Sequence, residues 1–409
     1  MRADSPTFDR TPLIEQRAAG ISDPVRRLRY LRVKMSEPAA TLAQPSETAP
    51  ARHRNTTWRL PHLGWLALPV ALALASGSSS KSAAETAARE RVLLVPRSVS
   101  LIPQPISNET GSLQIASTDN SAPVSRVWRI EQSESTDVYS NGLRVDLTFT
   151  VSNRPRAAFP IFPLTGAAIA VKWGSSPVGI VYHTTESQLT EFEEDRNHRL
   201  KQLGRNLLEV IRSQRSYHYV IDRFGRVFSV VAESDAANHV GNSVWADAEG
   251  IYVNLNDSFL GVAFEAQNGA TGEVTPAQIR AAKVLTEMLR SRYAIAAENC
   301  VTHAQVSVSP WNMLIGAHTD WAANFPFAAL GLPDNYAIPL ASIYAYGFEY
   351  DETFRQATQG LWKGLGLSLE QVERQAAAEH VPVPRYRSML QHRYKDLAAA
   401  LKQRSPGDM

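Results

Sequence analysis

Three short stretches, 178–183 (VGIVYH), 259–266 (FLGVAFEA) and 300–303 (CVTH), decide the fold of this chain. Each is an apolar run, which is typical of a strand. Helical patterns lie between them, over 189–212 and again after Thr275-Pro276, where Gln278 completes a capping box. Alternating strands and helices predict an α/β layer fold built on one sheet.

The segment between the first helix and the second stretch has the pattern of a hairpin. Residues 217–222 (YHYVID) and 226–231 (RVFSVV) flank a short loop at Gly225, which can adopt the left-handed conformation. The region 174–332 therefore contains the full alternation of elements, and we expect the chemistry to lie there.

The flanking regions have simpler patterns. Alternation in 127–132 and 143–151 predicts a β-rich extension over 126–173, either a separate appendage or added strands of the main sheet. Residues 76–125 are rich in Ser, Ala, Pro and Thr and are expected to be a flexible linker. Residues 333–409 carry helical patterns and are expected to form a helical C-terminal extension.

The first 75 residues contain a targeting signal. The apolar stretch 63–75 (LGWLALPVALALA) follows three arginines and precedes small residues, so the segment 52–75 is typical of a signal peptide. Its distance from residue 1 suggests translation from Met35, and the alternatives are an uncleaved membrane anchor or a buried helix. The signal-peptide interpretation is favoured, and it predicts an exported protein that is periplasmic, bound to the cell envelope or secreted.

Composition excludes several classes. The 409 residues contain 42 Lys and Arg against 40 Asp and Glu, so the net charge of +2 gives no general attraction to nucleic acid. No apolar run reaches the roughly 18 residues typical of a membrane span. The single cysteine, Cys300, allows no internal disulfide. We expect no nucleic-acid partner, membrane contact only through the N-terminal segment, and a monomer.

Two of the predicted strands end in histidines, His183 and His303, and Asp320 follows in the loop 317–327 (AHTDWAANFPF). A catalytic zinc site uses three protein ligands and one open position, so this set is a candidate site for one zinc ion, although the spacing alone does not establish it. A histidine at a strand end is more often only hydrogen-bonded, and an aspartate in a loop is usually a cap or turn residue.

Six blocks in order carry a family resemblance: 181–186 (VYHTTE), 216–228 (SYHYVIDRFGRVF), 238–241 (NHVG), 254–265 (NLNDSFLGVAFE), 301–307 (VTHAQVS) and 318–327 (HTDWAANFPF). The chain resembles the zinc-dependent N-acetylmuramoyl-L-alanine amidases of the type 2 family, which includes the peptidoglycan recognition proteins. The resemblance covers about 174–332 and implies a central mixed β-sheet flanked by helices, with zinc in a groove.

The resemblance also implies roles for individual residues. His183, His303 and Asp320 correspond to the family's zinc ligands, although Trp321-Ala322 replaces the usual Pro-Gly. Ala263 stands where many members have a catalytic Glu, so Tyr217 is the favoured polar group beside zinc. Glu265 is the second candidate, with a structural role as its alternative.

Other positions are expected at the groove. His318 replaces a family Lys and is expected to donate a hydrogen bond to an oxyanion. His239 and Asn256 match positions near the groove and are candidates for substrate contact or for a role in the fold. Trp245 is a candidate for sugar stacking.

The implied function is zinc-dependent hydrolysis of the amide between N-acetylmuramic acid and L-alanine, with peptidoglycan or muropeptides as partners. Two alternatives remain open at this point. One is a binding protein of the same fold that does not cut, and the other is a metalloprotein acting on a different amide.

Overall fold

The computed structural model describes residues 125–268 and 274–403, which belong to one compact unit, Gln104–Met409. The expected signal or anchor segment (1–75) and nearly all of the expected linker (76–125) lie outside the described residues. Within the described part, no helix is both long enough and apolar enough to cross a membrane.

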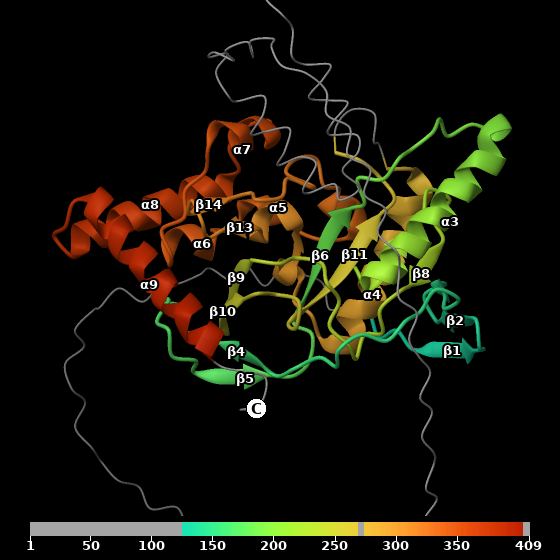
Figure 1. Cartoon of the computed structure of the whole chain (residues 1–409), viewed down its shortest axis with the longest axis horizontal. Helices are drawn as coiled ribbons and strands as arrows, with labels where there is room; N and C mark the ends of the chain where they lie inside the picture. The colour runs from blue at the N-terminus through green and yellow to red at the C-terminus, as the bar shows by residue number, and fades with distance from the viewer. Residues whose placement is uncertain (1–124, 269–273, 404–409) are drawn as a thin grey trace, which may run out of the picture. The chain divides into compact units, whose positions relative to one another are not determined.

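The centre of the molecule is an eight-stranded mixed sheet in the order β1-β2-β3-β8-β7-β11-β6-β12 (Figure 1). Its strands are β1 (Arg129–Gln132), β2 (Thr136–Tyr139), β3 (Arg144–Asp146), β6 (Gly179–Thr184), β7 (Tyr219–Ile221), β8 (Val227–Ser229), β11 (Phe259–Phe264) and β12 (Cys300–Thr302). The α/β fold with one central mixed sheet is thus confirmed.

The middle of the sheet is parallel. β11 pairs in parallel with β6 on one side and β7 on the other, and β6 pairs in parallel with β12. All residues of these four strands are buried. Burial on both faces explains their nearly continuous apolar sequences and brings their carboxyl ends to one edge.

The N-terminal strands enlarge this sheet. β1, β2 and β3 form an antiparallel meander, and β3 pairs in parallel with β8 through Val145 and Val227. For β1, β2 and β3, the structure therefore has added strands of the main sheet, one of the two arrangements that the sequence left open. Later in the same region, β4 (Phe159–Ile161) and β5 (Lys172–Gly174) form a separate ribbon.

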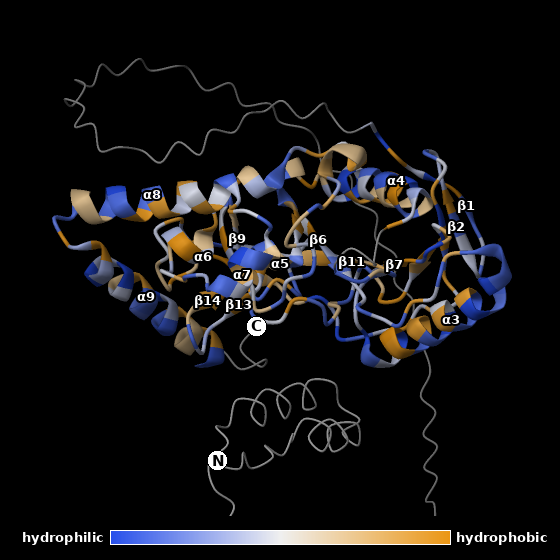
Figure 2. Cartoon of the chain, turned by 90° about the horizontal axis from the view of Figure 1, so that it is seen from above, coloured by the Kyte–Doolittle hydropathy of each residue, from blue (hydrophilic) through white to orange (hydrophobic). Residues whose placement is uncertain are grey.

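Two helices cover opposite faces of the sheet, α3 (Asn197–Gln214) and α4 (Pro276–Tyr293), as Figure 2 shows. Alternate residues of β7 therefore pack against different helices. Tyr219 and Ile221 belong to the apolar cluster that includes α4, whereas Val220 packs against α3. The first helix begins later than the predicted residue 189. A short 3₁₀ turn at Glu194–Arg196 precedes it.

The remaining elements pack together beside β6 and β12 in a second part of the core. They include three two-stranded ribbons: β4 (Phe159–Ile161) with β5 (Lys172–Gly174), β9 (Val244–Asp247) with β10 (Gly250–Val253), and β13 (Val308–Ser309) with β14 (Leu314–Ile315). The helices are α5 (His303–Val306), α6 (Ala341–Tyr344), α7 (Glu352–Ala357), α8 (Lys363–Ala378) and α9 (Val383–Gln403). The C-terminal helices share this core with β9 and β10.

Candidate metal site

Three metal-binding side chains meet at the carboxyl ends of two adjacent strands. His183 is the penultimate residue of β6, and His303 begins α5 directly after β12. These strands run in parallel with Thr302 opposite Tyr182, so the two histidines lie side by side. Asp320 reaches the same place from the loop after β14.

The donor atoms converge. Asp320 Oδ2 lies 3.1 Å from Nδ1 of His183 and 3.0 Å from Nδ1 of His303, and one ligand atom from each of the three residues lies within 4.8 Å of the others. All three side chains are buried. Tetrahedral zinc with ligands at its usual distances separates them by about 3.3–3.6 Å, so only small shifts are needed to hold an ion.

Electrostatics favour the metal-binding forms of His183 and Asp320. Burial, reinforced by neighbouring His303, lowers the pKa of His183 to about 4, so its ring is neutral near pH 7. Burial acts to raise the pKa of Asp320, but the two histidines outweigh it and hold this pKa well below its usual range. A neutral imidazole and an ionised carboxylate are the states that bind metal.

The hydrogen-bond directions also fit a cation. His239 Nε2 lies 3.3 Å from the carbonyl oxygen of Phe259, which can only accept, so His239 donates there and its Nδ1 carries a lone pair. That Nδ1 lies 3.1 Å from Nε2 of His183, which must therefore donate. In the neutral ring, Nδ1 of His183 is then an acceptor facing the Asp320 carboxylate. An acceptor nitrogen beside a carboxylate favours a cation between them, and these donors suit zinc.

Two further polar groups border the three donors. The centroid of the Tyr217 ring lies 4.9 Å from that of His183. His318, an exposed residue, stacks its ring on that of His303 with 4.6 Å between the centroids. Burial, followed by the charges of Asp320 and Glu186, raises the pKa of Tyr217, so its hydroxyl stays protonated. Tyr217 precedes β7 and has a left-handed φ of 58°, so its placement comes from a bend and not from strand alternation.

Glu265 contacts the β7–β8 turn. Its Oε2 accepts a hydrogen bond from the backbone N–H of Arg223, and a Cβ on Gly204 of α3 would lie 3.5 Å from the same oxygen. Within the described part of the chain, no hydrogen bond joins its carboxylate to the three donors. Ala263, not Glu265, lies opposite His183 in the strand register.

Three residues expected at the groove, Trp245, Asn256 and His239, make contacts within the fold. Trp245 is 1% exposed and its indole N–H donates to Asn299, so no ring face is open to a sugar and the stacking prediction is wrong. The side-chain oxygen of Asn256 accepts from the backbone N–H groups of His239 and Val240. His239 itself is buried behind His183.

A cavity of about 750 Å³ begins at His318 and continues between the β13–β14 turn and α9. Trp311, in that turn, is 97% exposed and lines it, as do Asn242, Asn254 and Lys402. Trp311 was not among the residues expected at the groove. A tryptophan between Pro310 and Asn312, two residues typical of turns, is the signal that indicates an exposed aromatic ring.

Comparison with known proteins finds similarity to one family. Residues 173–321 match the family model described as N-acetylmuramoyl-L-alanine amidase. N-acetylmuramoyl-L-alanine amidase AmiD of Escherichia coli (strain K12) is 29% identical over a match covering 32% of this chain and 55% of AmiD. The chain thus spans about half the length of this curated relative.

Solved structures with a similar arrangement include two complexes. AmpDh3 from Pseudomonas aeruginosa with anhydromuramic pentapeptide is 23% identical, covering 40% of this chain and 61% of that one, with a TM-score of 0.29. Escherichia coli AmiD with anhydro-N-acetylmuramic acid-L-Ala-D-gamma-Glu-L-Lys is 18% identical, covering 57% and 99%, with a TM-score of 0.31. By the family match, residues 173–321 are similar to the N-acetylmuramoyl-L-alanine amidases of the type 2 family.

Proposed function

We propose that this protein hydrolyses the amide bond between N-acetylmuramic acid and L-alanine of peptidoglycan or muropeptides, with one zinc ion held by His183, His303 and Asp320. The observation that carries the proposal is the buried set of two histidines and one carboxylate, in which the acceptor Nδ1 of His183 faces the carboxylate. The family match supports the same reaction.

Zinc supplies Lewis acidity, which makes a water molecule a stronger acid and polarises the scissile carbonyl. The surrounding side chains position the reactants. His318 lies on the exposed side of His303, where an imidazole N–H can donate a hydrogen bond to the carbonyl oxygen as negative charge develops on it. His318 therefore stabilises the oxyanion.

Tyr217 is assigned to the proton transfer. Its hydroxyl is protonated, and its ring lies beside His183. A protonated hydroxyl can orient the attacking water and pass its proton to the departing amine of L-alanine, while the proton released by the water restores the hydroxyl. Glu265 is assigned a structural role, because its carboxylate is engaged by the β7–β8 turn.

The cavity beside His318 is the proposed place for the substrate. Its exposed indole, Trp311, suits stacking on a sugar ring, and its polar groups Asn242 and Asn254 suit the hydroxyl and amide groups of a muropeptide. Lys402 at the α9 end is suited to a stem-peptide carboxylate. Because peptidoglycan lies outside the inner membrane, the proposal includes export of the protein, which acts as a monomer.

Mass spectrometry of muropeptides tests the function. Incubation of the full chain with purified peptidoglycan fragments and zinc should release free stem peptides and peptide-free glycans. A chelator should abolish the release, as should Asp320→Asn, which keeps the side-chain shape but removes the charge. Fragments that bind the zinc-loaded protein and are recovered intact would contradict catalysis and support a binding protein.

A further inference from the structure

We propose that His239 is a positioning residue, which fixes the tautomer and ring orientation of His183 so that Nδ1 of His183 is available to the metal. This inference rests on the metal site of the proposed function and assigns a role to a residue that lies behind that site. It depends on the contacts of His239 with β11, with His183 and with the loop that follows β10.

The imidazole of His239 bridges a backbone carbonyl and the proposed metal ligand His183, so the acceptor on one side fixes the proton position on the other. The carbonyl oxygen of Phe259 obliges His239 to donate from Nε2, which leaves Nδ1 as the acceptor for the Nε2–H of His183. The other tautomer of His183 would place two lone pairs 3.1 Å apart and a proton at the metal position. Metal-ligating histidines generally need such a partner on the second nitrogen.

Gly261 makes room for this ring. A Cβ on Gly261, in the middle of β11, would lie 2.7 Å from Cγ of His239, closer than side chains tolerate. The adjacent residue Leu260 is packed in the apolar core, as expected in a central strand. The glycine therefore serves the close approach of His239 to the strand that lies beside β6.

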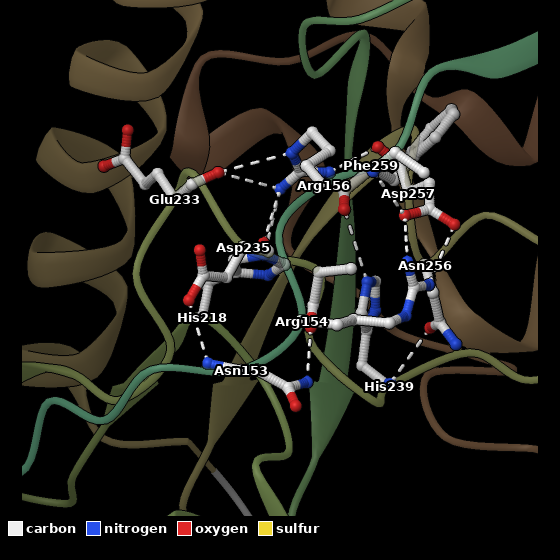
Figure 3. Close-up of polar contacts among 12 residues, drawn as sticks. Asn153, Arg154, Arg156, His218, Glu233, Asp235, His239, Asn256, Asp257 and Phe259 are labelled. Atoms are coloured by element: carbon white, nitrogen blue, oxygen red, sulfur yellow. Dashed lines mark hydrogen bonds and ion pairs between the residues drawn. The ribbon is translucent and has the colours of Figure 1, made fainter. Parts of the chain in front are cut away.

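The backbone of His239 is held from the loop after β10 (Figure 3). Asn256 accepts hydrogen bonds from the N–H of His239 and of the next residue. The neighbouring Asp257 is fixed by the N-terminal extension, because Arg154 makes two hydrogen bonds to its carboxylate at 2.6 and 2.8 Å and Arg156 donates to its carbonyl oxygen.

The same extension fixes the loop on the other side of His239. The N–H of Asn153 donates to the Asp235 carboxylate, its side-chain amide donates to the carbonyl of Ala236, and Arg156 donates to the carbonyl of Glu233 (Figure 3). These braces lie in 153–156, outside the region 173–321 that matches the family model. His239 is thus a fixed group, as a positioning role requires.

The test is the zinc affinity of the full chain, measured by competition with a chromophoric chelator. His239→Leu removes the acceptor, and we expect zinc to bind about 10- to 100-fold more weakly. His239→Asn is the matched control, because its side-chain oxygen can take the place of Nδ1, and we expect it to stay within about threefold of the wild type. Thermal unfolding of the metal-free proteins verifies that both variants fold.

Equal zinc affinity in the wild type and His239→Leu would overturn the inference, as would equal losses in the Leu and Asn variants. If the Leu variant does not fold, Gly261→Ala replaces it, since it keeps every imidazole but displaces the ring of His239. Unchanged affinity in that variant would also overturn the inference. Zinc affinity is read without substrate, so a wild type that binds zinc but cleaves nothing would refute the proposed function alone.

Discussion

At the scale of single residues, the surroundings of Tyr217 and Glu265 distinguish the two candidates for the catalytic group. Burial raises the pKa of Glu265 to about 7, above its usual 4.5, so its contribution to stability is present at low pH and is lost as pH rises from about 4.5 through 7. Between about pH 4.5 and pH 7, the metal-free wild type should lose up to about 3 kcal/mol of unfolding free energy relative to Glu265→Gln. Urea titrations of both proteins at several pH values measure this difference. A difference independent of pH would contradict this.

Hydrolysis should slow by about 100-fold in Tyr217→Phe and little in Glu265→Gln. The opposite order would make Glu265 the catalytic group.

At the scale of elements, the start of α4 links the helix to the hairpin beside the site. The hydroxyl of Thr275 accepts from the N–H of Gln278 and donates to the carbonyl of Arg223, while the Gln278 side chain donates to the carbonyls of Ile221 and Glu265. Thr275→Ala should lower the free energy of unfolding by about 1–2 kcal/mol, measured in urea. Thr275→Ser keeps the hydroxyl and serves as the control. Equal losses in the two variants would show that the methyl group, and not the cap, carries the effect.

At the scale of the molecule, the amidase domain and the C-terminal helices share one core. Trp245 and Phe259 belong to the same buried cluster as Leu390 of α9. Leu390→Ala should cost about 2–5 kcal/mol and shift tryptophan fluorescence and circular dichroism together in one unfolding transition. Met389→Ala changes a 43% exposed neighbour and should cost less than about 0.5 kcal/mol. Two separate transitions in the Leu390 variant would mean that the helices unfold independently.

Local pattern was sufficient for much of the fold. The apolar strands 178–183, 259–266 and 300–303, the hairpin at Gly225 and the capping box at Thr275 are short-range features, because burial on both faces, turn geometry and capping each select particular residue types. The late start of α3 at Asn197 was not predictable in this way, since its apolar spacing continues into the preceding loop. Element ends depend on tertiary contacts more than on periodicity.

The sequence by itself determined the strand ends where His183 and His303 stand, and through its motifs it indicated the family. Only the tertiary structure decided that Trp245 is buried, that Trp311 is exposed and that Glu265 faces the β7–β8 turn. It also placed His239 behind His183 and braced it with residues 153–156. The physical reason is that periodicity reports which face of an element is buried, whereas hydrogen-bond partners distant in sequence are fixed only when the elements pack.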